Sequence, residues 1–277
     1  MAYLLNNLYN GFRYRIKKIF HRPFSVFNIG WTKEKILKHQ TGKKLRYHLY
    51  KKKYKVAFTE SLTFLMSIEE LFIKEFYKFK TDKRRPKIID CGSYIGTSIL
   101  FFKINYPDAD VIGFEPDKTN YSILKLNTDN WKFRDIVIFN AAIWITDGNI
   151  SFNSAGNMSS KIEMNSGVVD EKSNIKCVRL KNLLNEEIDF LKIDIEGAEF
   201  AVLNDCADNL KNVNNLFIEY HGNYNEMFKL NGILDILLKA KFKYYIKEGN
   251  AVYDKPLWER DKKVDYDMLL NIFAFKD

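Results

Sequence analysis

The sequence predicts an α/β fold: a Rossmann-like, doubly wound sheet of seven mostly parallel strands with an antiparallel last strand, preceded by a basic N-terminal extension. Three observations carry this prediction. The chain has 277 residues, 46% of them hydrophobic, which is enough to bury the core of one sizeable domain. From Pro86 onward, short β-rich runs alternate with helical segments, a pattern typical of parallel sheets with right-handed crossovers. A glycine-containing turn joins the first of these runs to its helix, and an acidic residue ends the next run.

Positive charge gathers in the N-terminal extension. Residues 1–56 carry 15 of the 44 Lys and Arg but one acid, Glu34, whereas the rest of the chain is net acidic. Apolar residues between Leu5 and Ile19 recur at helical spacing with basic residues between them. This pattern predicts a basic amphipathic helix that ends just before Pro23.

Two more elements precede the predicted sheet. Partial alternation over residues 43–58 predicts two basic strands, and apolar spacing over residues 61–79 predicts a helix. We therefore divide the chain into a basic extension, 1–56, and a catalytic domain, 57–277, that begins with a helical lead-in, 57–85.

The elements of the catalytic domain follow in order from its hydrophobic pattern. A polar stretch over 151–174, rich in Ser, Asn and Gly, interrupts them and predicts a hairpin or a mobile loop. Strands are expected at 87–90, 110–115, 136–139, 188–194, 215–221, 242–247 and 268–275, and helices from Ser98, over 118–130, from Ala198 and up to about Ala240.

The run IIDCGSYIGTS holds the turn between the first of these strands and its helix. Glycines let the backbone approach a ligand closely, and a helix N-terminus offers free N–H groups to a negative moiety. The dinucleotide spacing GxGxxG is absent, because Ser93 and Tyr94 follow Gly92. This favours an adenosyl cofactor without pyrophosphate, its amino-acid part held near Asp90; a plain glycine turn is the alternative. We expect cofactor contacts from Asp90, Gly92, Ser93, Tyr94 and Gly96.

An acid at the tip of the next strand extends this site. Glu115 ends the run VIGFE, where a carboxylate can accept hydrogen bonds from both hydroxyls of a ribose; a solvated turn before Pro116 is the alternative. Asn140, Ala141 and Ala142 end the third strand, and their small side chains leave room for an adenine ring. We expect these five residues to complete the cofactor site.

Five motifs, IIDCGSYIG, FEPD, NAAI, FLKIDIEGAE and IEYHG, in this order resemble the FkbM family of methyltransferases. The resemblance is strongest from Ile88 to His221 and extends more loosely from about Tyr54 to the end of the chain. It implies a class I methyltransferase fold, S-adenosyl-L-methionine as cofactor and O-methylation. In this family the acceptor is often a sugar of a glycan, a surface polysaccharide or a natural product.

The chain departs from the family pattern at two places. Tyr94 stands where the family often has Asn, which affects contacts near the methionine part of the cofactor. Arg179, Leu180 and Lys181 stand where the family often has Thr-Leu-Asp, so no role is carried over for that acid.

The run LKIDIEGAE places acids at the carboxyl end of the fourth strand. Asp194 ends the strand, at the edge where ligands bind in open parallel sheets, and Glu196 follows in the turn. We expect Asp194 to border both the cofactor and the acceptor. Glu199 falls in the first turn of the next helix, where the helix dipole alone favours an acid.

Methyl transfer to a hydroxyl needs an aligned acceptor and a group that takes its proton. His221 ends the fifth strand in FIEYHG and has a suitable pKa range. Asp194 is the competing base, or it orients His221 instead. We predict that the base is one of these two and favour His221.

A metal site is the alternative reading of these acids. Asp194, Glu196, Glu219 and His221 offer oxygen and nitrogen ligands that could hold Mg²⁺ near a sugar diol. We do not expect a metal to be required.

Composition also bears on partners and location. No run approaches the roughly 18 apolar residues that span a bilayer, and no secretory signal pattern is present at the first residues. Cys91, Cys177 and Cys206 lack the number and spacing of a disulfide framework or a zinc site. We therefore predict a cytoplasmic protein. Basic and aromatic residues of the extension favour peripheral contact with the inner face of an anionic membrane or, alternatively, packing on the domain.

Other functions are less well supported. Nucleic acid would also use the positive charge, but no recognition motif supports it. A nucleotide-dependent oxidoreductase would need the missing pyrophosphate pattern. The main alternative to a carbohydrate O-methyltransferase is a catalytically degenerate methyltransferase fold that serves as a binding module in a membrane-associated glycan assembly complex.

Overall fold

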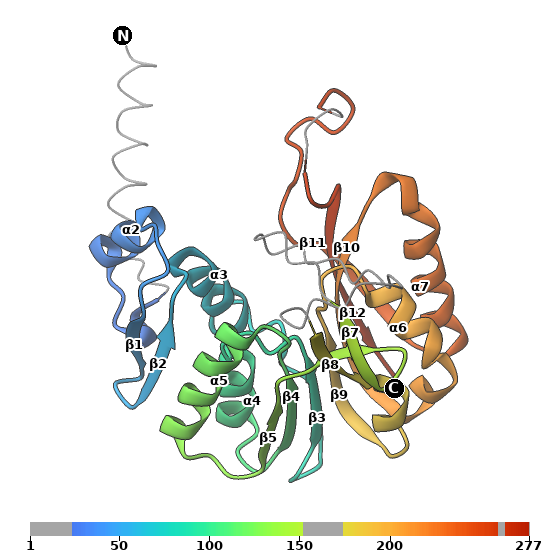
Figure 1. Ribbon diagram of the computed structural model, residues 1–277, viewed down its shortest axis with the longest axis horizontal. Helices are drawn as coiled ribbons and strands as arrows, with labels where there is room; N and C mark the ends of the chain where they lie inside the picture. The colour runs from blue at the N-terminus through green and yellow to red at the C-terminus, as the bar shows by residue number, and fades with distance from the viewer. Residues whose placement is uncertain (1–23, 152–173, 260–263, 277) are drawn as a thin grey trace.

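A computed structural model of the chain describes residues 24–151, 174–259 and 264–276. Its centre is a seven-stranded sheet of order β11-β12-β10-β9-β3-β4-β5 (Figure 1). Only β12, the last strand in the chain, runs against its neighbours, which confirms the predicted topology. The strands are β3 (Lys87–Cys91), β4 (Asp110–Phe114), β5 (Ile136–Phe139), β9 (Ile188–Ile193), β10 (Val213–Gly222), β11 (Lys243–Glu248) and β12 (Met268–Phe275).

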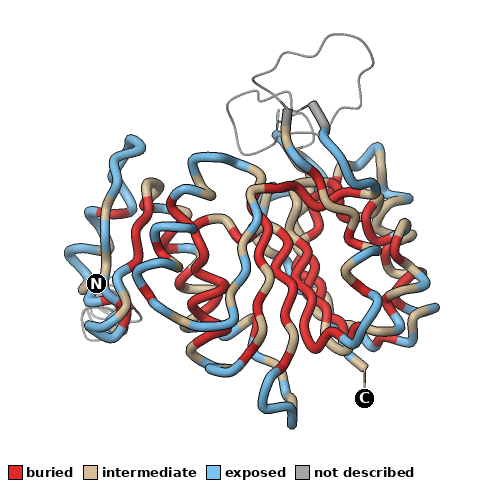
Figure 2. The backbone as a smooth tube through the Cα atoms, turned by 60° about the horizontal axis from the view of Figure 1, so that its bottom comes forward, coloured by how far each residue is buried: buried red, intermediate tan, exposed pale blue. Residues whose placement is uncertain are grey.

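The central strands β3 and β9 are buried on both faces, as parallel strands in the middle of a sheet require, whereas the edge strands β5 and β11 are partly exposed (Figure 2). Successive strand residues point to opposite faces, so Ile88 and Ile89 belong to different hydrophobic clusters. One cluster includes α4 (Thr97–Asn105) and part of α5 (Lys118–Trp131), and the other includes α6 (Glu199–Asp205) and α7 (Met227–Lys239).

A second, three-stranded sheet lies where none was predicted. It has the order β6-β8-β7 and is built from β6 (Ala142–Trp144), β7 (Gly148–Ser151) and β8 (Asn174–Arg179). The third strand of the main sheet ends at Phe139, so the expectation that Ala142 ends that strand is wrong. The apolar run AAIW holds no glycine or proline to mark a new strand. β7 and β8 pair antiparallel on either side of residues 152–173, and the predicted loop lies there, outside the described residues.

The described part of the N-terminal extension packs on the catalytic domain. It holds η1 (Ser25–Phe27), α2 (Trp31–His39) and the two predicted strands, β1 (Arg46–Tyr50) and β2 (Tyr54–Phe58), which form a hairpin. The buried Asn127 amide on α5 accepts a hydrogen bond from the Ala57 N–H at 2.7 Å and donates one to the Ala57 carbonyl at 2.9 Å. The division predicted between residues 56 and 57 falls within β2. The predicted helix between Leu5 and Ile19 lies outside the described residues.

The helical lead-in is shorter than predicted. α3 (Ser61–Phe72) ends seven residues before the expected Phe79. The aromatic residues beyond it pack against the sheet instead: the Tyr77 ring lies 4.7 Å from Phe217 and the Phe79 ring 5.1 Å from Phe190. In the described ranges, no helix is long and apolar enough to cross a membrane.

Candidate active site

Two glycines with positive φ shape the turn between β3 and α4: +90° at Gly92 and +88° at Gly96. A side chain at Gly92 would overlap the backbone carbonyl of Asp194, so this turn lies directly against the end of β9. A side chain at Gly96 would instead meet Leu124 of α5. Gly92 therefore borders the site, whereas Gly96 lets α4 pack closely on α5, away from the expected ligand.

Glu115 follows β4 and is only 6% exposed. Its Oε2 accepts a hydrogen bond from the Tyr94 N–H at 2.8 Å, and its Oε1 accepts one from the Asp117 N–H at 2.9 Å. Burial raises the pKa of Glu115 to about 8, although both backbone N–H groups oppose the shift. Asn140 donates to the Glu115 and Pro116 carbonyls at 2.9 and 3.0 Å. The predicted ribose ligand is thus held rigidly beside the glycine turn.

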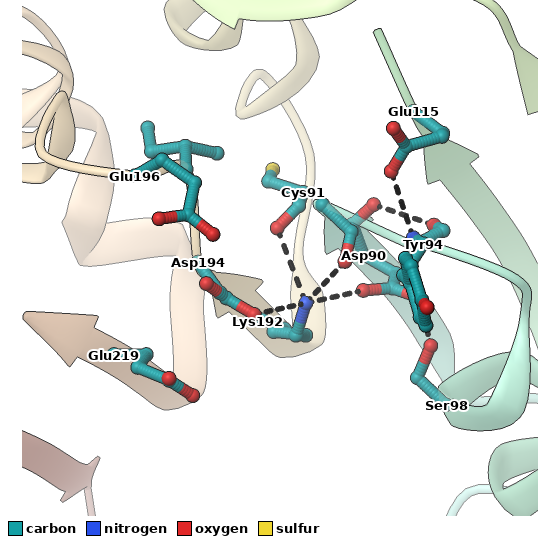
Figure 3. Close-up of polar contacts among 12 residues, drawn as sticks. Asp90, Cys91, Tyr94, Ser98, Glu115, Lys192, Asp194, Glu196 and Glu219 are labelled. Carbon is teal, nitrogen blue, oxygen red and sulfur yellow. Dashed lines mark hydrogen bonds and ion pairs between the residues drawn. The ribbon is translucent and has the colours of Figure 1, made fainter. Parts of the chain in front are cut away.

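A buried lysine joins the glycine turn to the acidic turn after β9. The Lys192 ammonium lies 3.4 Å from Asp90 Oδ1 and 3.2 Å from Asp194 Oδ2, and it donates to the Gly92 carbonyl at 2.5 Å (Figure 3). Asp90 is fully buried, and its other oxygen accepts from the Ser98 hydroxyl at 2.5 Å. Burial lowers the pKa of Lys192, but Asp194 and Asp90 outweigh this and raise it well above its ordinary value. The lysine therefore remains charged.

Several residues predicted to contact the cofactor lie in the interior. Ser93 is 1% exposed and its hydroxyl donates to the Asp90 carbonyl at 3.1 Å, while Ala141 and Ala142 belong to the hydrophobic core. Asp90 has no exposed surface. These four residues support the residues that line the site and do not themselves offer surface to a ligand. Apart from Gly96, the other predicted cofactor residues can face a ligand. They are the carboxylate of Glu115 and the partly exposed Gly92, Tyr94, Pro116, Asn140 and Asp194.

The turn after β9 is strained and tightly tied. Glu196 and Gly197 both have positive φ, +56° and +95°. Glu199, fully buried at the start of α6, accepts hydrogen bonds from the Gly197 and Ile195 N–H groups at 3.0 and 3.3 Å. The same oxygen lies 3.0 Å from His221 Nδ1. Glu199 thus fixes the acidic turn and His221 together, a role beyond the helix dipole.

His221 lies on β10 with its ring between acidic groups. Its Nε2 is 3.5 Å from Glu196 Oε2 and 3.9 Å from Glu219 Oε1. Burial lowers the pKa of His221, but Glu199, Glu196 and Asp194 raise it to about 10. The expectation that Asp194 orients His221 is corrected: Glu199 does so, because Asp194 pairs with Lys192. The histidine is therefore charged at neutral pH while no ligand is bound.

Carboxylates crowd this half of the site. Ligand atoms of Asp194, Glu219 and His221 lie within 4.8 Å of one another, and Glu196 is not part of that group. Burial, reinforced by Asp194, raises the pKa of Glu219 to about 8, and burial raises that of Glu196 to about 7. The donor set suits a hard cation, but such an ion would have to replace the proton of His221, whose other nitrogen already faces Glu199.

Three residues of the site are not predicted by the local sequence patterns. Lys192 is a lone charge in the apolar strand FLKI, and such a charge is the sequence signal of a buried ion pair. Glu199 fits the helix dipole, so its sequence position does not reveal its contact with His221. Tyr266, from the chain between β11 and β12, donates to the Glu196 carbonyl at 3.1 Å, and its ring lies 4.7 Å from that of His221. Its distance in sequence from every motif hid this contact.

Comparison with known proteins gives the family. Residues 90–244, more than half of the chain, match the family model described as "Methyltransferase FkbM domain". The chain belongs to the FkbM methyltransferase family. The FkbM domain so defined contains the glycine turn, Glu115, Lys192 and His221.

Two fungal proteins are similar in sequence. Methyltransferase sdnD of Sordaria araneosa is 25% identical over 170 residues, which cover 49% of this chain and 66% of that protein. Methyltransferase 1 of Beauveria bassiana (strain ARSEF 2860) is 23% identical over 164 residues, covering 50% of this chain and 66% of that protein. The chain thus spans just under two thirds of the length of the curated relatives it matches.

Solved structures give weaker likenesses. The FkbM methyltransferase of Methylobacillus flagellatus KT superposes with a TM-score of 0.49 at 15% identity, over 76% of this chain and 48% of that one. M. jannaschii TYW2, solved in complex with AdoMet, gives 0.46 at 10% identity, over 86% of this chain and 87% of that one.

Proposed function

We propose that this FkbM protein is an S-adenosylmethionine-dependent O-methyltransferase whose acceptor is a sugar hydroxyl. The observation that carries the proposal is the juxtaposition of Gly92 and Glu115 with His221 across one sheet edge, bridged by Lys192 and Asp194. Ligands of open parallel sheets bind at this edge. The family membership supports methyl transfer, and the carboxylates around His221 suit an acceptor rich in hydroxyl donors.

The residues on the cofactor side fit an adenosyl group. Gly92 is partly exposed and carries no side chain, so a ligand can approach the backbone of the turn where it lies against the Asp194 carbonyl. Each Glu115 oxygen accepts a single backbone hydrogen bond and keeps lone pairs for a ribose diol. Asp90 and Lys192 hold the turn from beneath. When bound, the cofactor supplies a methyl group activated by a sulfonium, which leaves alignment and proton removal to the protein.

His221 is the proposed base, with Asp194 as the weaker candidate. Nδ1 of His221 faces Glu199, which leaves Nε2 to take the acceptor proton. Asp194 is already paired with the Lys192 ammonium at 3.2 Å, so its carboxylate is engaged on the cofactor side. A positive charge brought close to the ring opposes imidazolium formation, so cofactor binding would lower the pKa of His221 toward the working range.

A product analysis tests the proposal. The protein would be incubated with S-adenosylmethionine carrying a ¹³C-methyl group and a panel of neutral and acidic oligosaccharides, and the products examined by NMR. A ¹³C signal at the chemical shift of a sugar methoxyl, absent with His221→Asn, would support O-methylation. A methyl group on nitrogen or carbon, or cofactor binding with no transfer to any glycan, would contradict it.

A further inference from the structure

A small cavity lies beside the candidate active site, on the side of His221 away from the glycine turn. It measures about 160 Å³. Its walls come from the end of β11, the connection between β11 and β12, the start of β12 and the segment after β10, with Tyr224, Tyr253, Asp267, Glu248 and Asn250 as polar or aromatic members. The described parts of this connection project beyond the sheet at the edge where β10 ends (Figure 1).

Two consecutive residues couple the cavity to the site. The Tyr266 ring contacts His221 at 4.7 Å, and its hydroxyl donates to the Glu196 carbonyl. The next residue, Asp267, lines the cavity, and its N–H donates to the carbonyl of Gly222, which directly follows His221, at 2.8 Å. Only the short segment that holds Tyr266 and Asp267 therefore separates His221 from the cavity, so one extended ligand could contact both.

The aromatic wall is held ready before any ligand arrives. The Tyr224 and Tyr253 rings stack with centroids 5.9 Å apart and planes 16° apart. Asp267 fixes both residues: Oδ1 accepts from the Tyr253 hydroxyl at 2.6 Å and Oδ2 from the Tyr224 N–H at 2.8 Å. Tyr253 is buried, whereas Tyr224 keeps 42% of its surface exposed. Binding against Tyr224 therefore costs little ordering.

The chemistry of the lining narrows the ligand. The ten lining residues that the structure describes include two carboxylates, Asp267 and Glu248, and the amide of Asn250. A phosphate, sulfate or uronate would lie beside these two carboxylates, and like charges in one site repel each other. An uncharged sugar suits the lining, because its C–H face can lie on an aromatic ring while its hydroxyls donate to carboxylate and amide oxygens.

We propose that this cavity is an acceptor subsite that binds an uncharged sugar unit next to the one that is methylated. The inference rests on the proposed function and deepens it: the acceptor is an oligosaccharide or glycan of at least two units, rather than a free monosaccharide. Tyr224 is the stacking residue of this subsite, and Asp267 is the residue that positions it.

The test compares wild type with Tyr224→Ala and with a matched control, Tyr245→Ala. Tyr245 is 64% exposed on β11 and lies outside the cavity lining. A glycan array carrying uncharged and anionic mono- to tetrasaccharides is probed with each protein in the presence of S-adenosylhomocysteine. We expect wild type to bind uncharged oligosaccharides of two or more units, with affinity about tenfold lower in Tyr224→Ala and unchanged in Tyr245→Ala.

Binding confined to anionic glycans, equal loss in both variants, or no glycan binding at all would overturn the subsite. Calorimetric titration of each variant with S-adenosylhomocysteine separates this failure from that of the proposed function. Normal titration without glycan binding removes the subsite and leaves a methyltransferase with another acceptor. No titration by folded wild type removes the proposed function itself.

Discussion

The two halves of the candidate site differ in how their charges are satisfied. On the cofactor side, Glu115 is held by two backbone N–H groups, and the buried Asp90 lies against Ser98 and Lys192. On the acceptor side, Glu196 and Glu219 face the same ring of His221, with raised pKa values for both acids. Burial raises the pKa of Glu115 to about 8 as well, but two backbone hydrogen bonds hold its carboxyl group in place before any ligand binds. The acids of the second half instead face a titratable histidine, so this half can change its protonation state when a ligand arrives.

The largest effect is expected at Lys192, where the two halves meet. Lys192→Met leaves the fully buried side chain of Asp90 without its ion-pair partner, which should lower the free energy of unfolding by about 3–5 kcal/mol. Lys103→Met is the matched control, because Lys103 is also buried but donates to a neutral partner, the Ala109 carbonyl, at 2.7 Å. Its cost should be about 1–2 kcal/mol. If urea unfolding gives equal losses of unfolding free energy for the two variants, the ion pairs of Lys192 do not stabilise the fold as described.

The next effect concerns the rate and its dependence on pH. A base must be unprotonated, so the raised pKa of His221, about 10 without ligand, predicts a rate that climbs as pH rises above neutrality. His221→Asn should lower kcat by about 10²- to 10⁴-fold without lowering the affinity for S-adenosylmethionine.

Glu199→Gln sharpens this prediction. Removing the carboxylate beside Nδ1 should move the pH profile of the rate toward the ordinary pKa of histidine, so that the climb begins at lower pH. If Glu199→Gln leaves the pH dependence of the rate unchanged, or if the rate of wild type increases as pH falls, His221 is not the base.

The smallest effect is a gain in stability. The raised pKa of Glu219 means that the folded state favours the protonated acid, so the fold loses stability as pH rises from about 4.5 to about 8. Glu219→Gln should therefore raise the free energy of unfolding at pH 8 by about 1 kcal/mol and change it little at pH 4. Asp194→Asn should instead destabilise, since Lys192 loses a partner. Stabilisation by both changes would contradict the assigned pairing.

The same contrast explains what the sequence could predict. The glycine turn, Glu115 and the strand order come from local patterns, because each motif falls at the end of its own strand. Tyr266 and the cavity around Asp267 depend on a connection far along the chain, which no local pattern places beside β10. Lys192 was overlooked because a charge in an apolar strand reveals its partner only once Asp90 and Asp194 are brought together.

Burial also decided which predicted residues face a ligand. Ser93 and Gly96 are residue types that commonly occur in ligand-binding turns. The Ser93 hydroxyl, however, donates to the buried Asp90 carbonyl, and Gly96 lies closely against Leu124. Ala142 begins a strand of the second sheet rather than ending the third strand of the first. Spacing alone does not distinguish a residue that lines a site from one that supports it.

Calorimetric titration with S-adenosylmethionine tests the central claim most directly, using wild type, Glu115→Ala and His221→Asn. We expect binding by wild type, affinity at least about tenfold lower in Glu115→Ala, where the ribose acceptor is gone, and affinity no lower than that of wild type in His221→Asn. Far-UV circular dichroism of each protein confirms that it is folded. No heat of binding with folded wild type, or equal affinity in Glu115→Ala, would contradict the assignment of this sheet edge as the cofactor site.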